Sequence, residues 1–345
     1  KFSNEHIEFV ALHLKRIIKT MFYAKAQSNN HWISESTALF IGGSWLMKVS
    51  KKYHTKGKKW SLIGRENLEI SVNKLVMSDG SFSQHSLTYH RLVLDLLCQA
   101  EIWRNFLKLP TFSVAYNKKF SLLIEWFNFF IDKESGDGPN LGANDGAFCF
   151  QLHDLPFRDF RPTLELSTAL NNKFKNSFLP IGLWDQPLYW LGLKKKAFNK
   201  NIILLNKTFN DGGYIVMRTN NSYSWGLLRL PKYFIRPSHN DPLHFDLWNM
   251  GVNILRDGGS FSYSASKDII DYFSGIKSHN SIEFKNNQMI RYGRFLLGNK
   301  IKYKNKIIKQ DTKKYSKYLT NYSFNKNFHS REVMNRPNLK SWEII

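Results

Sequence analysis

The sequence predicts an α+β protein of two domains, a helical domain over residues 1–200 and a β-rich domain over residues 201–345. In the first part, apolar residues recur at steps of three and four, which is the period of an amphipathic helix. After about residue 200 the chain changes to short β-branched and aromatic runs separated by turn residues, which indicate antiparallel strands. Because the helices precede the strands and do not alternate with them, the pattern favours two separately built layers over a parallel α/β fold.

Six segments of the first part show the helical period, and breaks such as HTKGKK, SDGS and KESGDGPNLGANDG separate several of them. The predicted helices cover residues 5–27, 35–53, 65–77, 85–106, 120–131 and 161–169. The predicted strands lie in the runs NIILLN, GGYIVMR, SWGLLRL, LHFDLW, SFSYSA, NSIEFK and IIKQ.

Composition narrows the classes of partner. The formal net charge of +23 predicts attraction to a polyanion such as nucleic acid, an anionic membrane surface or an acidic polysaccharide. Codon bias toward Lys, Asn, Ile and Phe would produce the same charge, so the charge alone does not choose a partner. No known nucleic-acid-binding motif accompanies it, so we do not expect nucleic acid as a partner. No apolar run reaches the roughly 18 residues of a membrane span. Cys98 and Cys149 lie in apolar runs that favour free thiols, so any metal would need His, Asp or Glu ligands.

Three polar residues of the β-rich part could meet at strand ends. His239, Asp257 and His279 stand in RPSHNDPLHFDLWNMGVNILRDGGSFSY and KSHNSIEF, next to successive strand-like runs. Two imidazoles and a carboxylate are ligand types that Zn²⁺ accepts. The same residues would also serve as hydrogen-bonded polar structure, and the spacing alone leaves both readings open.

Two polar blocks lie at predicted helix starts in the helical part. Asn30 and His31 precede a helix that Ser34 or Ser36 could cap. Further along, the block SDGSFSQHSLTYH places Gln84, His85, Tyr89 and His90 near the start of another helix. Tyr89 follows His85 and Ser86 by one helical turn, so these side chains can share a face. Capping and packing would also explain each block singly.

Taken in order, the motifs NNH, DGSFSQHSLTYH, SHNDPLHFDLWNMGVNILRDGGSFSY, SHNS and QMIRYGRF resemble the heparinase II/III family of polysaccharide lyases, over roughly residues 28–295. The resemblance implies an incomplete (α/α) toroid that lacks its first helices, followed by an antiparallel β-sandwich. It also implies β-elimination of a uronate-containing glycan in a cleft between the two domains, in a periplasmic or secreted bacterial protein.

The resemblance assigns roles to particular residues. Asn30 and His31 match the family's neutralising pair, and Tyr89 matches its catalytic tyrosine. A second catalytic tyrosine from the β-rich part corresponds to Tyr263 or Tyr272. The family's structural metal ligands match His239, Asp257 and His279, which implies Zn²⁺.

One departure concerns Pro237, which stands where several members have a further histidine. We therefore expect Tyr89 to act as the base, with a cation such as His85, His90 or an arginine favouring its phenolate. Tyr89 could then return the proton to the leaving oxygen. The predicted substrate contacts are His85, His90, Arg236 and Arg294, with Arg291 as a further candidate, because guanidinium groups bind carboxylates and sulfates.

Two other functions fit the same residues. A noncatalytic or degenerate protein would bind an acidic glycan without cleaving it, as Pro237 suggests. A metal-dependent hydrolase would use His239, Asp241, Asp257 and His279 to generate hydroxide.

Overall fold

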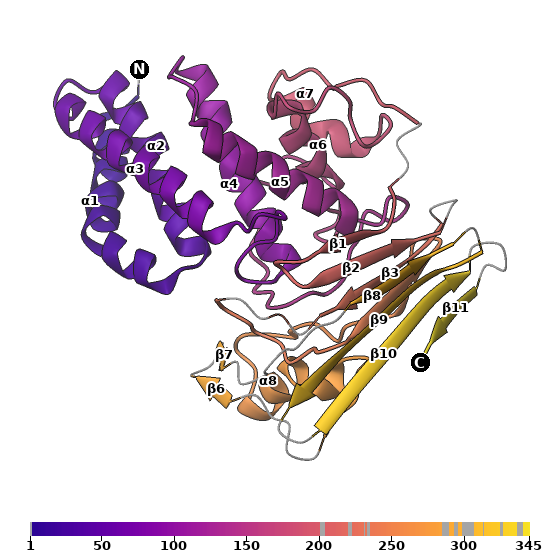
Figure 1. Ribbon diagram of the computed structural model, residues 1–345. Coiled ribbons are helices and arrows are strands. Elements are labelled where there is room, and N and C mark those ends of the chain that lie inside the picture. The colour runs from indigo at the N-terminus through magenta and orange to yellow at the C-terminus, as the bar shows by residue number, and fades with distance from the viewer. Residues whose placement is uncertain are drawn as a thin grey trace.

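The chain forms a helical part followed by a part built of antiparallel sheets, as the sequence predicts (Figure 1). The computed structural model describes residues 2–200, 204–219, 223–230, 232, 235–284, 290–292, 296–298, 307–312, 314–324, 327–336 and 341–345. The helices of the first part are α1 (Asn4–Gln27), α2 (Asn30–Val49), α3 (His54–Leu75), α4 (Leu87–Phe106), α5 (Val114–Phe130), α6 (Arg161–Leu170), the 3₁₀ turn η1 (Leu183–Asp185) and α7 (Gln186–Trp190).

Each predicted helix is present, but α2 begins five residues early. Asn29 caps it by accepting a 3.0 Å hydrogen bond from the backbone N–H of His31. The predicted caps Ser34 and Ser36 therefore lie inside the helix. The predicted break HTKGKK also lies inside a helix, α3.

Glycines explain why this break is absent. A Cβ on Gly43 of α2 would lie 2.5 Å from the backbone nitrogen of Ser61, and one on Gly64 of α3 would lie 2.3 Å from that of Phe40. The glycines of α2 and α3 thus let two helix backbones touch, an advantage that offsets the cost of glycine inside a helix.

Two antiparallel sheets make up most of the second part. The first has the order β1-β2-β3-β4-β5, with β1 (Lys207–Phe209), β2 (Tyr214–Arg218), β3 (Ser224–Arg229), β4 (Phe245–Asn249) and β5 (Val252–Leu255). The second has the order β11-β10-β9-β8, with β8 (Ile308–Asp311), β9 (Ser316–Phe324), β10 (Asn327–Arg336) and β11 (Ser341–Ile344). A small hairpin, β6 (Ile290–Tyr292) and β7 (Leu296–Gly298), and the helical turns α8 (Lys267–Ser274) and η2 (Ile276–Ser278) complete the described elements.

Not every predicted strand forms. The runs GGYIVMR, SWGLLRL, LHFDLW and IIKQ contain β2, β3, β4 and β8, whereas SFSYSA and the described residues of NSIEFK are loops. NIILLN begins outside the described residues, and its last three residues are not a strand. In SFSYSA, Ser260 exchanges hydrogen bonds with the helical part, donating to the carbonyl of Gly142 and accepting from the N–H of Asn144. Because these hydrogen-bond partners are far away in the sequence, the local alternation of residues in SFSYSA wrongly predicts a strand.

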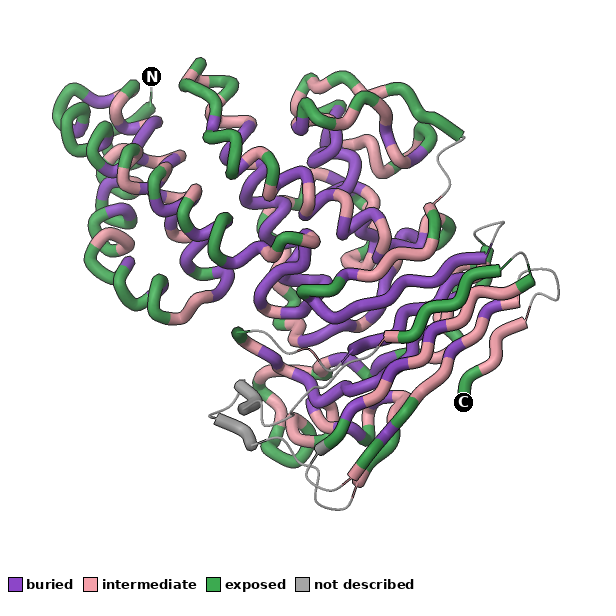
Figure 2. The backbone as a smooth tube through the Cα atoms, in the orientation of Figure 1, coloured by how far each residue is buried: buried purple, intermediate pink, exposed green. Residues whose placement is uncertain are grey.

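The central strands β2 and β3 of the first sheet are buried on both faces. Tyr214 and Val216 of β2 pack into the core that the helices form, whereas Ile215 and Met217 pack with Tyr318 of the second sheet. Successive strand residues point to opposite faces, which explains this division. Figure 2 shows the result as a buried band that runs from the helices into the first sheet. The sheet therefore holds the helical part and the second sheet in fixed positions.

Candidate active site

Two tyrosines from different parts of the chain meet at the junction. The hydroxyl of Tyr89, in the first turn of α4, donates a 2.9 Å hydrogen bond to Oδ2 of Asp145. The hydroxyl of Tyr263 lies 3.0 Å from that of Tyr89. A tyrosine hydroxyl carries one hydrogen, so Tyr263 is the donor to Tyr89. We call Tyr89, Asp145 and Tyr263 the tyrosine cluster.

A loop over residues 141–147 holds this cluster together. Ser86 caps α4 by accepting from the N–H of Tyr89 at 3.1 Å and donates to the carbonyl of Ala143 at 2.6 Å. The N–H of Ala143 donates to Ser238 of the sheet part at 3.0 Å. Gly142 has a φ of +65°, and a Cβ there would lie 2.2 Å from the carbonyl oxygen of His85. Only glycine fits this contact, which brings Asp145 to Tyr89.

Arg236 and His31 flank the tyrosine cluster. Arg236 is half-buried and donates to the carbonyl of Gln27 at the end of α1. The backbone N–H of Asn30 donates to Oε1 of Gln84 at 2.8 Å, which fixes the start of α2 beside the chain that leads into α4. Partial burial and the charge of Arg236 lower the pKa of His31, so its imidazole is neutral at pH 7.

The two tyrosines are protonated at neutral pH, and they are not equivalent. Burial, Tyr263 and Asp145 raise the pKa of Tyr89 far above its usual value. Burial also raises the pKa of Tyr263, to about 12, although the hydrogen bond with Tyr89 and the charge of Arg236 oppose the shift. Loss of the Tyr89 proton would leave a phenolate against the carboxylate of Asp145, so Tyr263 is the hydroxyl that ionises more readily.

The structure also separates the two candidates for the second tyrosine. Tyr263 reaches Tyr89, whereas Tyr272 is 50% exposed on α8 and packs edge-on against Phe273. No proton-transferring side chain is present at Pro237.

His90 lies in the core of the helical part. His90 is 0% exposed, stacks on Trp126 with ring centroids 4.2 Å apart, and contacts the carbonyl of Leu123 through Nε2 at 2.9 Å. The prediction that His90 contacts substrate or favours a phenolate is therefore wrong, because the ring lies in the core. His85 is buried, with its Nδ1 3.3 Å from the hydroxyl of Tyr214. Among the described residues, Arg236 is a cation whose charge interacts with both tyrosines. Arg294 and the side chain of Arg291 lie outside the described residues.

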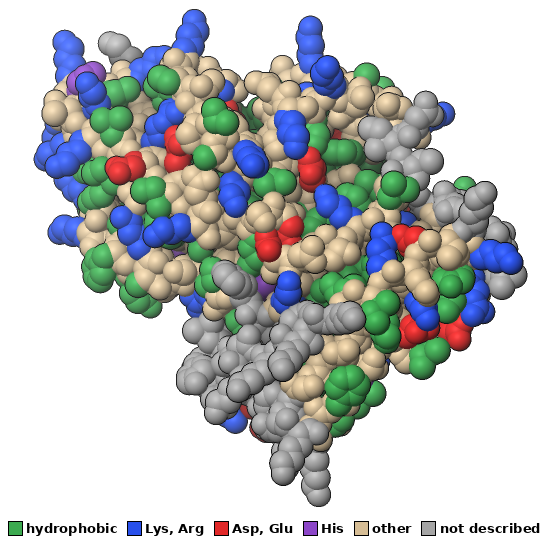
Figure 3. Space-filling view, viewed as in Figure 1, with side chains coloured by type: hydrophobic (Ala, Val, Ile, Leu, Met, Phe, Trp, Pro, Cys, Tyr) green, Lys and Arg blue, Asp and Glu red, His purple; other side chains and the backbone are tan. Residues whose placement is uncertain are grey.

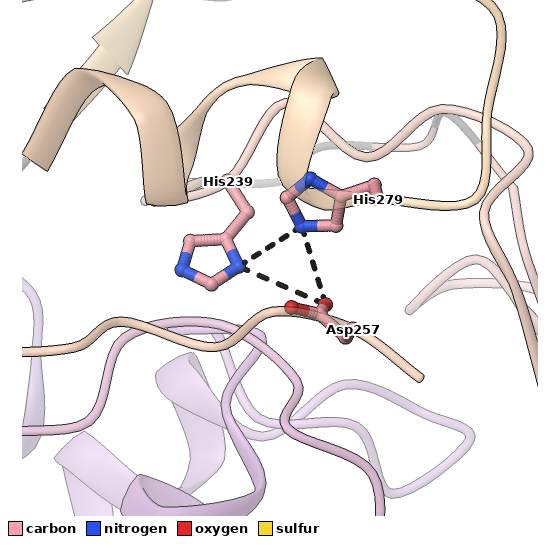
Figure 4. A group of neighbouring side chains, drawn as sticks. All are labelled: His239, Asp257 and His279. Carbon is pink, nitrogen blue, oxygen red and sulfur yellow. Dashed lines mark hydrogen bonds and ion pairs between the residues drawn. The ribbon is translucent and has the colours of Figure 1, made fainter. Parts of the chain in front are cut away.

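The three predicted metal ligands meet within the sheet part (Figure 4). Nε2 of His279 lies 3.2 Å from Oδ2 of Asp257 and 3.4 Å from Nδ1 of His239, and Nδ1 of His239 lies 3.8 Å from the same carboxylate oxygen. All three side chains are buried. We call these residues the His-Asp-His group.

The surroundings of the His-Asp-His group fit a metal ion. Nδ1 of His279 contacts the carbonyl of Gly275 at 2.7 Å, which leaves Nε2 with its lone pair directed at the group. Nε2 of His239 contacts Ser260 at 3.1 Å, and Oδ1 of Asp257 accepts from the N–H of Gly259 at 2.7 Å. Oδ2 of Asp257 is buried and accepts no hydrogen bond from the described residues. A cation would satisfy that oxygen.

Asp241, which a hydrolase would use as well, is already engaged, because its Oδ2 lies 3.3 Å from Nε of the buried Arg229.

Sequence reasoning missed Asp145 altogether. Its only local signal is the turn sequence ANDG, which does not indicate a contact with Tyr89.

Comparisons with known proteins agree with these observations. Residues 205–345 match the family model described as Heparinase II/III-like, C-terminal. The resemblance seen in the sequence motifs is therefore confirmed, and the second part of the chain is heparinase II/III-like.

Among individual proteins, the chain is 25% identical over 285 residues to heparin-sulfate lyase of Bacteroides thetaiotaomicron, which covers 75% of this chain and 37% of that protein. It resembles the crystal structure of heparinase III with a TM-score of 0.59 and 19% identity, over 90% of this chain and 46% of that one. Heparan sulfate lyase HepC from Pedobacter heparinus gives a TM-score of 0.61 at 17% identity, over 90% and 44%. The chain thus spans less than half the length of each of these proteins, and the structural likeness shows the fold.

Proposed function

We propose that this chain is part of a polysaccharide lyase that cleaves an acidic, uronate-containing glycan by β-elimination. The observation that carries the proposal is the 3.0 Å contact between the hydroxyls of Tyr89 and Tyr263, which come from the helical part and the sheet part. The names of the similar proteins, which are lyases, support it. We also infer that the helices are part of an (α/α) toroid and that the two sheets form a β-sandwich.

β-Elimination removes the C5 proton of a uronate and expels the oxygen on C4, leaving a C4–C5 double bond. Negative charge builds on the uronate carboxylate in the transition state. Hydrogen bonds from Asn30 and His31 to that carboxylate would stabilise the charge where it develops. Arg236, beside His31, adds a positive charge to the same place.

The tyrosines would divide the proton transfers. Tyr263, the more readily ionised, takes the C5 proton, and the charge of Arg236 stabilises its phenolate. Tyr89, whose pKa is raised further, gives its proton to the C4 oxygen as that bond breaks. Tyr263 thus fills the role for which Pro237 has no group, and Asp145 orients the hydroxyl of Tyr89.

His239, Asp257 and His279 would hold Zn²⁺ as a structural ion, with a fourth ligand such as water. The ion would tie together the loops before β4 and after β5. The loop after β5 carries Ser260 and Tyr263, so the ion would act on catalysis only by keeping Tyr263 in place.

The positive charge of the chain suits such a substrate. Figure 3 shows Lys and Arg side chains spread over one face of the helical part, with fewer acidic side chains among them. In the part of the chain that the structure describes, no helix is both long and apolar enough to cross a membrane.

A panel of uronate polysaccharides, with and without sulfate, tests the proposal. Cleavage should produce the ultraviolet absorbance of an unsaturated uronate with at least one member of the panel. Tyr89→Phe should abolish the signal, and Tyr189→Phe is the matched control because Tyr189 is 79% exposed on α7. Products without the double bond would indicate a hydrolase, and binding without cleavage would indicate a glycan-binding protein. Either result would overturn the proposal.

A further inference from the structure

A cavity of about 440 Å³ lies between the helical part and the sheet part, and none of the tyrosine cluster lines it. Its walls come from the end of α5, the segment 178–184 and the end of the β2–β3 hairpin. Arg218, the last residue of β2, lines it, whereas Tyr214, the first residue of that strand, contacts His85. The two ends of a five-residue strand are about 13 Å apart at the usual rise per residue. The cavity is therefore separate from the proposed active site, and its volume falls within the range of small-ligand sites.

Two cations line this cavity, and neither forms an ion pair in the part of the chain that the structure describes. Arg218 is 6% exposed and donates through Nη2 to the carbonyl of Phe129 at 2.6 Å, but its buried Nε has no hydrogen-bond partner among the described residues. Lys133 donates to the side-chain oxygen of Asn128 and lies 5.9 Å from the ring centre of Phe178. Burial, and then the charge of Arg218, lower the pKa of Lys133 to about 7. An anion bound between the two cations would give the buried Nε of Arg218 a hydrogen-bond acceptor, and it would offset the repulsion between the two positive charges.

The acidic residues of the lining do not neutralise the pair. Asp132 is engaged elsewhere: its Oδ1 accepts from the N–H of Ser135 at 2.9 Å, and its Oδ2 accepts from Nε1 of Trp225 at 3.0 Å. Glu134 is exposed. Neither carboxylate forms an ion pair with Arg218 or Lys133 among the described residues, but the charge of Asp132 still acts on both cations. The two cations therefore outweigh the one buried carboxylate of the lining, and the excess positive charge is available to a ligand.

The remaining walls suit the flat, apolar faces of a small ring. Leu179 and Pro180 lie on one wall, and the rings of Phe198 and Tyr223, which are 38% and 60% exposed, are accessible to a ligand. Convergent charged groups in a largely apolar cavity are typical of a ligand site.

We propose that this cavity binds one carboxylate-bearing sugar residue, with Arg218 and Lys133 on the carboxylate and Tyr223 against the ring. The choice of a sugar acid over other carboxylates rests on the proposed function, whereas the need for an anion rests on the cavity alone. The site would hold a second stretch of an acidic glycan away from the tyrosine cluster.

Titration calorimetry of the full chain with sodium glucuronate, a uronate oligosaccharide, sodium benzoate and glucose tests the proposal. Glucuronate and the oligosaccharide should bind, and glucose should not. Tyr89→Phe should leave glucuronate binding at this cavity unchanged, which separates failure of this site from failure of the proposed catalytic one. Equal binding of glucose, or binding of benzoate alone, would overturn the proposal.

Two variants assign the binding to the cavity. Lys133→Gln and Tyr223→Ala should each weaken glucuronate binding by about tenfold or more, as expected for loss of a charge-assisted contact or an aromatic wall. Tyr223 is exposed, so its variant folds even if Lys133→Gln does not. Lys52→Gln is the control, since its side chain is 69% exposed and paired with Glu8 on the far helices. Unchanged affinity in Tyr223→Ala and in a folded Lys133→Gln would place the ligand elsewhere and overturn the proposal.

Discussion

The tyrosine cluster and the His-Asp-His group are both tight constellations of polar side chains, but they are built differently. The tyrosine cluster draws on α4, the loop 141–147 and the loop after β5, and its Asp145 is exposed. The His-Asp-His group lies wholly within the sheet part, and its three side chains are buried. The first reaches the surface through Asp145 and the partly exposed Tyr263, although Tyr89 is buried, and the second is enclosed by its own hydrogen bonds. We conclude that the first is suited to chemistry and the second to holding loops in place.

The sharpest test of this contrast is a double-mutant cycle on the tyrosines. Tyr89→Phe and Tyr263→Phe should each lower glycan turnover by about 10³-fold, within the usual range for loss of a general acid or base. The double variant should be little slower than either single one, because the base and the acid serve the same elimination and neither is effective without the other. Turnover is measured by product absorbance, and melting temperatures should stay close to that of the unmodified chain. Additive losses would show that the hydroxyls act independently.

Removing the metal from the His-Asp-His group should lower the stability of the fold, whereas the tyrosine variants should lower turnover. Chelation should lower the free energy of unfolding by about 3 kcal/mol, as expected for loss of an ion at a hundredfold excess over its Kd. Metal analysis should find one ion per chain, and His279→Ala should remove it. Calorimetric melting with and without chelator measures the effect. Loss of cleavage with an unchanged melting temperature would contradict a structural role and place the ion in the chemistry.

The buried His90 provides a test by pH. Its folded pKa of about 3, set by burial, lies below the ordinary value of 6.5, so the unfolded chain binds one more proton between these values. The stability that His90 contributes is thus complete above pH 6.5 and is lost as the pH falls. Between pH 7 and pH 5 the unmodified chain should lose about 2 kcal/mol relative to His90→Leu.

Urea unfolding of both chains at the two pH values measures this difference, with His13→Leu as the control for an exposed imidazole. A difference that does not change with pH would mean that His90 is not buried as a neutral ring.

Asp145→Asn should have the smallest effect, about a tenfold loss of turnover, because the amide still accepts a hydrogen bond from Tyr89. Removing the carboxylate removes a charge that raises the pKa of both tyrosines. Tyr263, the tyrosine with the lower pKa, would then ionise at lower pH, so the rise of the rate toward alkaline pH should begin at lower pH. A rate profile that stays in place would show that Asp145 only positions the loop.

Local patterns predicted the helices and the ligand types, because periodicity and residue chemistry are properties of short segments. They failed where a long-range partner decides the outcome, as with Tyr263, whose run reads as a strand until Ser260 is seen to bond the loop 141–147. The error at His90 was avoidable. Neighbouring residues on a helix point about 100° apart, so Tyr89 and His90 cannot both face the same groove. Asp145 could not be found from its own surroundings.

The burial of β2 and β3 on both faces has a consequence for dissecting the chain. Cutting between α7 and β1 would leave the side of the sheet that carries Tyr214, Val216 and Trp225 bare, together with the matching side of the helices. Large bare apolar surfaces drive association in water. Fragments cut there would tend to aggregate, so engineering of this chain should begin at its solvent-facing loops.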